Sequence, residues 1–405
     1  MINSNCKSIF NYIILTCFTL YGFTFLLDMK INFLTTSFIF CIILYLILKK
    51  NNLISINLSK DIKTLNYVLF IFLILILIST IYTESSLSTY RSRFLSPLLG
   101  LFIFYFYPFK QKHLILIFLS FSFILLINSL IIIYQFSQGN IGRPTGMVGN
   151  HYMFLAVFNT LILPIIFCFC LSKNVPSKLR IFFAITLIFN IPAIIFENTR
   201  IVWISLFISF MIVILLSKIN IKRILLIFIS IFISIFILLQ ISPNSLTRLK
   251  SISDISYQNQ SNYERLLMWQ SATNMFIDHP IYGVGIDNYY NEYIHNYRSP
   301  LSREKQHHPH NVLLTFLSET GLLGTFGYVT LFLYLFYHSI KTYIKNYNIF
   351  ALAYLACLIS FTINSLTDSI FSQIGYGKCT TFFWIITGLY FYINNHISIK
   401  YKKYI

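Results

Sequence analysis

Long, nearly uncharged apolar runs recur along this chain and limit what it can fold into. Each run is about 17–25 residues long, which is the length that a helix needs to cross a bilayer. The runs are continuous, whereas the strands of a membrane β-barrel alternate apolar and polar residues. Only 10% of the 405 residues are charged, against about 25% in soluble domains. The sequence therefore predicts an all-α, polytopic membrane protein.

The apolar runs divide the chain into three parts. Residues 1–242 carry nine predicted membrane helices with short loops, residues 243–311 form one large loop with short helices, and residues 312–405 carry three more membrane helices and a C-terminal tail. The first run lacks an obvious small-residue cleavage site, so we expect it to be a retained helix. The twelve spans are predicted at about 9–27, 31–48, 65–82, 94–109, 114–136, 151–171, 179–196, 201–217, 224–242, 312–337, 349–366 and 380–395.

The connecting segments alternate in charge. With the N-terminus in the cytoplasm, 18 of the 30 basic residues and one acid fall on the cytoplasmic side. This distribution fits the positive-inside rule, so we expect both termini in the cytoplasm and the large loop outside. The formal net charge of +18 is then mostly a signal of membrane topology, and we expect the basic residues to contact membrane lipids. No motif indicates nucleic-acid binding.

Arginine dominates on the outer side only. Eight of the 12 basic residues expected there are arginines, against two of the 18 on the cytoplasmic side. Because a guanidinium binds phosphate or carboxylate in a bidentate way, this bias favours an anionic, phosphate-bearing substrate. Pairing with local acids or with lipid headgroups would also explain it. The candidates are Arg91 and Arg93 in "TYRSRF", Arg143 in the glycine-rich "GRPTGMVG", Arg200 in "ENTRIVW" and Arg265 in "YERLLMW".

Two of these arginines have simple alternative roles. Arg200 heads a short span, where it could anchor the helix at the membrane surface or pair with Glu197, three residues earlier. Arg265 lies near the start of a predicted helix and could pair with Glu264 or Asp254.

The helix that carries Arg265 is predicted from "YERLLMWQSATNMFIDHP". Leu266, Trp269, Thr273 and Phe276 recur at helical spacing on one stripe, and Pro280 should end the helix. The following "IYGVGIDNYY" lacks the Gly-Lys-Ser/Thr end of a phosphate loop, so no nucleotide site is indicated.

The loop ends in a histidine cluster, "HHPHNV". His307 and His310 could bind a metal, but Pro309 disfavours a regular helix there and no third ligand stands at a recognisable spacing. A solvated cluster at the membrane surface is a second interpretation. A third is a general base, since a neutral imidazole can accept a proton from a hydroxyl. His310 is the best candidate because Asn311 behind it is a plausible helix N-cap. His310 would then stand at the mouth of a membrane helix.

Two acids near the same membrane face need partners. Glu319 lies two turns inside the predicted span, where an unpaired carboxylate would be costly, so it should face a cavity or a partner. Asp368 ends the next span on the same side and could orient an arginine or a histidine, or simply mark a wet helix end.

Three segments together resemble the O-antigen ligase family: "ENTRIVW", "NYERLLMWQSATNMFIDHPIYGVGIDNYY" and "HHPHNVLLTFLSETGLLG". The resemblance implies a bacterial inner-membrane glycosyltransferase with about twelve spans and one large periplasmic loop. Its donor would be a glycan on undecaprenyl diphosphate and its acceptor a sugar of lipid A–core. Arg200 and Arg265 would hold the diphosphate and His310 would activate the acceptor hydroxyl, with no cofactor. Arg143, Arg91, Arg93, His307, His308 and Asp368 are secondary candidates.

Other functions are also compatible with the sequence. An O-antigen polymerase would use the same donor with a lipid-linked glycan as acceptor, and a ligase for another polysaccharide or for protein O-oligosaccharides is also compatible. A lipid-linked oligosaccharide flippase would need basic residues inside the spans, whereas here they stand at span ends.

Overall fold

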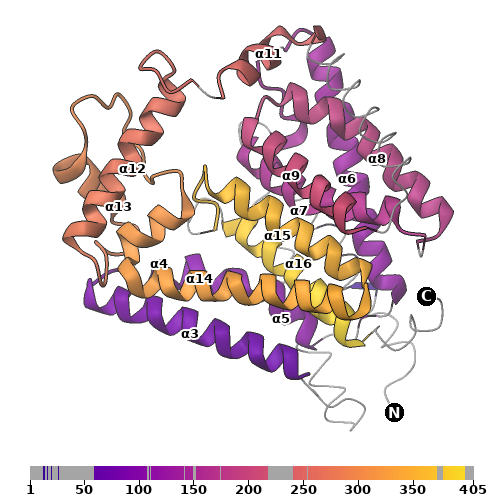
Figure 1. Cartoon of the computed structure of the whole chain (residues 1–405), viewed down its shortest axis with the longest axis horizontal. Coiled ribbons are helices and arrows are strands. Elements are labelled where there is room, and N and C mark those ends of the chain that lie inside the picture. Colours follow the sequence, from indigo (N-terminus) through magenta and orange to yellow (C-terminus); the bar gives the residue numbers. More distant parts are fainter. Residues whose placement is uncertain are drawn as a thin grey trace.

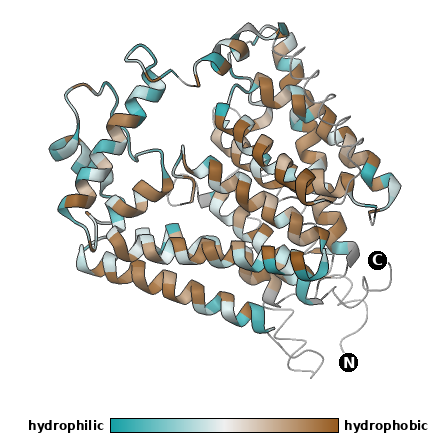
Figure 2. Cartoon of the chain, in the orientation of Figure 1, coloured by the Kyte–Doolittle hydropathy of each residue, from teal (hydrophilic) through white to brown (hydrophobic). Residues whose placement is uncertain are grey.

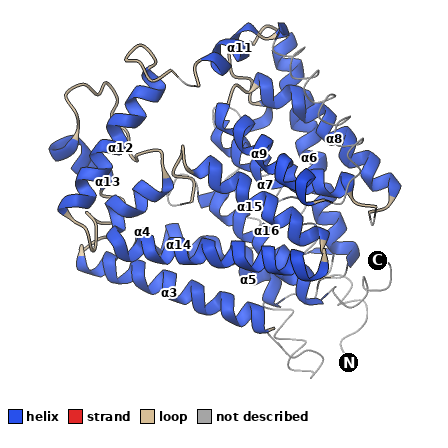
Figure 3. Cartoon of the chain, viewed as in Figure 1, coloured by secondary structure: helices blue, strands red, loops and turns tan. Residues whose placement is uncertain are grey.

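The structure is a computed structural model. It describes residues 59–106, 109, 111–140, 142–148, 152–173, 175–217, 240–252, 254–371 and 377–396, together with five single positions nearer the N-terminus. Every regular element in these ranges is helical, as the sequence predicts (Figure 3). The predicted spans 9–27, 31–48 and 224–242 lie almost wholly outside the described residues, so the predicted count of twelve stays a prediction.

Five described helices are long and apolar enough to cross a membrane. They are α3 (Lys60–Tyr82), α6 (Gln111–Ser137), α7 (Tyr152–Leu171), α8 (Ser177–Phe196) and α14 (Val312–Asn346). They coincide with predicted spans, although α14 continues to Asn346, beyond the predicted end at residue 337. Three further apolar helices match predicted spans in position, namely α9 (Arg200–Leu216), α15 (Ile349–Ser365) and α16 (Gly377–His396).

The predicted span at 94–109 is wrong as a single helix. The chain runs through α4 (Leu87–Tyr90), the π-helix η1 (Arg91–Leu95) and the 3-10 helix η2 (Ser96–Leu98) before α5 (Leu99–Phe106). Pro97 lacks the N–H that a regular helix needs, and the wider π turn precedes it. The result is a change in register that turns Arg93 inward, where its side chain is fully buried.

The helices pack as a bundle. α14 runs along α3, α15 packs against α7 and α9, α16 packs against α5, and α6 against α8 (Figure 1). Hydrophobic residues cover these helices, while polar residues gather on α11 (Pro243–Lys250), α12 (Gln260–Asp278), α13 (Tyr289–Glu292) and the loops between them (Figure 2). The predicted large loop is therefore the polar part of the described molecule.

Helix α12 forms where the sequence predicts it, but it buries a different face. Trp269 and Phe276 are only half-buried and Leu266 is exposed. The buried face is formed by Glu264, Leu267, Met268, Ser271, Ala272 and Met275. Because small and polar residues make up part of this face, hydrophobic spacing alone does not identify it.

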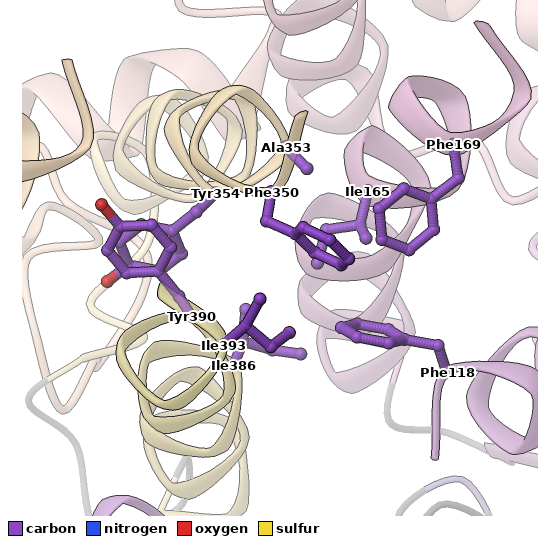
Figure 4. Close-up of a pocket in the computed structure, with 9 residues that line it drawn as sticks. All are labelled: Phe118, Ile165, Phe169, Phe350, Ala353, Tyr354, Ile386, Tyr390 and Ile393. Carbon is purple, nitrogen blue, oxygen red and sulfur yellow. The ribbon is translucent and has the colours of Figure 1, made fainter. Parts of the chain in front are cut away.

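An apolar pocket lies where α6, α7, α15 and α16 meet (Figure 4). On α15 its lining residues stand in the first two turns, at the opposite end of the helix from Asp368. Apart from the rings of Tyr354 and Tyr390, the lining is aliphatic or phenylalanine. The pocket is lined by Phe118, Ile165, Phe169, Phe350, Ala353, Tyr354, Ile386, Tyr390 and Ile393.

Candidate functional site

Helix α14 is broken near its start, and the loop after α12 fills the break. Gly321 has φ 59° and ψ −156°, which interrupts the helix. The N–H groups of Val284 and Gly285 bond to the carbonyls of Ser318 and Glu319 at 2.8 and 3.0 Å. Backbone groups that a kink leaves unpaired are thus satisfied by the loop, as a membrane setting requires.

Only glycine fits at the closest contacts of this junction. A Cβ on Gly321 would lie 2.4 Å from the carbonyl carbon of Ile281, and one on Gly283 would lie 2.4 Å from that of Glu319. Both glycines also have positive φ, which other residues rarely adopt. The "PIYGVG" and "GLLG" elements of the sequence are therefore the two halves of one backbone junction.

Glu319, just before the break, has the partner that the sequence requires. Its Oε2 lies 2.7 Å from an Nη of Arg93, and both side chains are almost fully buried. Arg93 belongs to η1, on the segment where a regular span was expected. The charge of Arg93 is thus used in a buried ion pair, which argues against a direct role in binding phosphate.

His310 stands immediately before the start of α14. Asn311 caps this helix, since its side-chain oxygen accepts the N–H groups of Leu313 and Leu314 at 3.0 and 3.2 Å. The backbone of His310 is left-handed, with φ 51°, so no regular helix includes it. Both expectations for this position, the cap and the loop setting of His310, are confirmed.

The imidazole of His310 is held by Asp368, which follows α15. Nδ1 of His310 lies 3.2 Å from Oδ1 of Asp368, whose side chain is 2% exposed. Burial raises the pKa of Asp368, but the His310 hydrogen bond, the charges of His308 and His310 and the Ser369 N–H outweigh it, so the net direction is downward. An ionised Asp368 favours the tautomer in which Nδ1 of His310 carries the proton. Nε2 is then left as a base.

His308 lies beside the same carboxylate but is used differently. Its Nδ1 accepts the backbone N–H of His310 at 3.3 Å and is 3.9 Å from Oδ1 of Asp368. Burial lowers the pKa of His308 to about 3, with repulsion from His310 in the same direction and attraction by Asp368 opposing it. His308 is therefore neutral at physiological pH. His307 is exposed and stacks on Tyr290 at 4.2 Å.

The donor atoms of His308, His310 and Asp368 all lie within 4.8 Å of one another, so the three could hold a metal ion. This set differs from the one considered in the sequence, which was based on His307 and His310 and had no recognisable third ligand. The positive charges of arginines that lie nearby disfavour a cation here. The geometry suits a hydrogen-bonded base and carboxylate as well as it suits a metal.

Arg200 and Arg265 both donate hydrogen bonds to the side chain of Ser261. Arg200, the first residue of α9, donates to Ser261 Oγ at 3.3 Å, and Arg265 donates to the same oxygen at 3.0 Å. Arg200 also bonds Ser251 and Asn262. Glu197 is not its partner, and Glu264 accepts from Ser302 and from the Arg303 N–H instead of from Arg265. The two arginines are thus not neutralised by the acids that the sequence offered.

Two further arginines join this pair. Arg143 stacks over Tyr152 at 4.4 Å, and its charge repels Arg200, Arg248 and Arg265. Burial and then Arg143 lower the pKa of Arg248. Burial also lowers the pKa of Arg265, while Asp368 opposes the change. We call Arg143, Arg200, Arg248 and Arg265 the arginine cluster.

The arginine cluster offers positive charge and unpaired N–H donors to an anion. Buried Nε groups of Arg143 and Arg265 have no hydrogen-bond partner among the described residues. Like charges brought this close repel, so a bound anion would relieve the repulsion as well as satisfy the donors. Diphosphate has the charge and the number of acceptor oxygens that such a cluster needs.

Glu197 shows why the cluster keeps its charge. It is fully buried and accepts from Asn159 and Thr199 at 3.2 and 3.1 Å. Burial raises its pKa to about 8, against the lowering effects of Thr199, Arg143 and Asn159. It is therefore mostly protonated near pH 7 and does little to neutralise Arg143.

The structure thus sorts the predicted site residues. It brings together Arg143, Arg200, Arg265, His308, His310 and Asp368, and Asp368 links the two groups because its charge attracts Arg265. Arg91 is exposed on η1, and Arg93 is paired with Glu319. Sequence reasoning missed Arg248 as a site residue. It was counted among the outer arginines, but no motif or helix head singled it out.

The chain was compared with models of protein families. The family described as O-antigen ligase matches residues 183–329. The matched region contains Arg200, Arg248, Arg265 and His310. A comparison with curated proteins gave no match.

Proposed function

The chain belongs to the O-antigen ligase family, and from this premise we propose that it is an O-antigen ligase of the bacterial inner membrane. It would transfer a glycan en bloc from undecaprenyl diphosphate to a sugar of lipid A–core, at a site facing the periplasm. The observation that carries the proposal is the His310–Asp368 pair beside the arginine cluster. A base and an anion site in one place are what this transfer needs.

The arginine cluster would bind the diphosphate of the donor. As the bond from the anomeric carbon to the diphosphate oxygen breaks, its electron pair goes to that oxygen. Guanidinium groups placed at the developing charge stabilise the transition state. Arg200 and Arg265 share Ser261, so we assign them the central role, with Arg143 and Arg248 completing the cluster.

His310 would supply the base. Nε2 takes the proton from the attacking acceptor hydroxyl while the hydroxyl oxygen bonds to the anomeric carbon. Asp368 holds the ring through Nδ1 and stabilises the imidazolium that forms. Direct displacement inverts the anomeric configuration. The base and the charge stabilisation both come from side chains, so the proposed reaction requires no cofactor.

A deletion strain separates the ligase from its main alternative. Loss of all polymer from lipopolysaccharide, with long chains retained on the lipid carrier, supports the ligase. Core bearing a single repeat unit would instead identify a polymerase. Unaltered lipopolysaccharide with loss of another surface glycan would identify a ligase for that glycan.

The site assignment is tested in purified protein. Arg200→Ala and Arg265→Ala should each abolish transfer, and His310→Ala should leave only a small residual rate, while each protein still inserts in the membrane. Arg91→Ala is the matched control, since Arg91 is exposed on η1, and it should keep full activity. Full activity in His310→Ala would remove the base assignment.

A further inference from the structure

The backbone at His310 is in an unfavourable conformation that its neighbours must maintain. A φ of 51° lies in the left-handed region, which is unfavourable for a residue with a Cβ. On its C-terminal side the chain is fixed by the Asn311 cap. On its N-terminal side the carbonyl of Pro309 accepts a hydrogen bond from Nε1 of Trp269 at 2.9 Å. Trp269 therefore fixes the peptide group that leads directly into His310.

Trp269 also stands on the helix face that carries the arginine cluster's shared contact. Ser261, Arg265 and Trp269 are spaced i, i+4 and i+8 on α12, so they lie along one side of the helix. Ser261 Oγ accepts hydrogen bonds from Arg200 and Arg265, and two turns later Trp269 donates to the carbonyl of Pro309 in the loop of His310. On an adjoining face of α12, Met268, Ala272 and Met275 pack in one buried cluster with Tyr289 and Tyr293.

We propose that Trp269 is a positioning residue, which holds the base-bearing loop at a fixed distance from the anion site through the rigid helix α12. This inference rests on the proposed function, because it assumes that His310 is the base. It explains why an arginine and a tryptophan occur one helical turn apart. The arginine serves the diphosphate and the tryptophan serves the base.

Trp269→Phe tests the role, since it keeps an aromatic ring and removes the N–H. A displacement of a base by a fraction of an ångström lowers the chemical rate strongly, so we expect kcat to fall about 10- to 100-fold. KM for the lipid diphosphate donor should change less than threefold, because the arginine cluster is untouched. A fall in melting temperature with unchanged kcat per folded molecule would refute the proposal and leave only a structural role.

Trp203→Phe is the matched control. Its indole N–H also donates to a backbone carbonyl at 2.9 Å, that of Ile194, but the bond joins α9 to α8. This variant loses the same kind of hydrogen bond and should retain kcat. An equal loss of kcat in both variants would refute a specific link between Trp269 and the base.

A double variant separates this inference from the proposed function. In a His310→Ala background, with radiolabelled donor to detect the residual rate, Trp269→Phe should cause no further loss, because it acts through His310. A full additional loss would refute the positioning role and leave the base assignment intact. Full activity of His310→Ala itself would instead overturn the proposed function and this inference together.

Discussion

Asp368→Asn tests how the base is activated. The variant keeps the shape of the side chain and an oxygen that can accept from Nδ1 of His310, but it removes the charge. At 3.2 Å, the attraction between a carboxylate and an imidazolium is about 5 kcal/mol in an effective dielectric of about 20, which is an upper bound. The hydrogen bond to a charged group sets a lower bound of about 1.5 kcal/mol.

The expected loss lies between these bounds. Arg265 also draws on the charge of Asp368, which weakens its hold on His310. We therefore expect about 2–3 kcal/mol, or a fall in kcat of roughly 100-fold. Loss of a negative charge beside the arginine cluster should leave donor KM unchanged or lower it, a combination that partial unfolding would not produce.

The assay is transfer of a radiolabelled, lipid-linked glycan to lipid A–core by the reconstituted protein, with kcat and donor KM measured separately. Asp278→Asn is the matched control, because Asp278 accepts from Tyr297 at 2.8 Å in the same polar segment but lies exposed at the end of α12. It should retain kcat. If Asp368→Asn keeps kcat within twofold while His310→Ala is inactive, the proposed link between the two side chains is wrong.

Three further outcomes follow from buried or clustered charges. Arg93→Ala should lower the free energy of unfolding by about 3–5 kcal/mol, because Glu319 is left buried without its cation. The double variant Arg93→Met with Glu319→Gln should lower the free energy of unfolding less. Equal melting temperatures for the two variants would contradict this. The raised pKa of Glu197 means that the folded state favours the protonated acid, so the free energy of unfolding should fall as pH rises from 4.5 to about 8. Glu197→Gln should flatten that slope in thermal unfolding scans, and an unchanged slope would argue against it. Chelators should leave transfer intact, because the proposed base and charge stabilisation come from side chains; loss of activity with chelator would revive a required metal.

Most of the described helices could be predicted because the information for them is local. Hydropathy fixed α3, α6, α7 and α8 to within a few residues, and Asn311 marked the start of α14 through its own side chain. Propensity failed at residues 91–98, where a π turn and a 3-10 turn replace a regular helix. Apolar composition cannot report such a change, since the residues are equally apolar in either conformation.

The partners of the charged side chains could not be predicted in the same way. Arg93 and Glu319 are 226 positions apart, and His310 and Asp368 are 58 apart. The sequence required a partner for Glu319 but did not identify it. Where it offered a near neighbour, as Glu197 for Arg200, proximity in the chain was misleading, because Glu197 bonds Asn159 and Thr199.

Charge balance separates the arginines that stabilise the fold from those available to a substrate. Arg93 is matched by one buried carboxylate and has no net charge left to offer. The acids whose charges reach the arginine cluster are Asp368, Glu304 and Glu197. Asp368 is engaged by His310, Glu304 accepts from two glutamines, and Glu197 is mostly protonated near pH 7. The cluster therefore keeps a positive excess beside the base, and a bound polyanion would relieve the repulsion among its guanidinium groups.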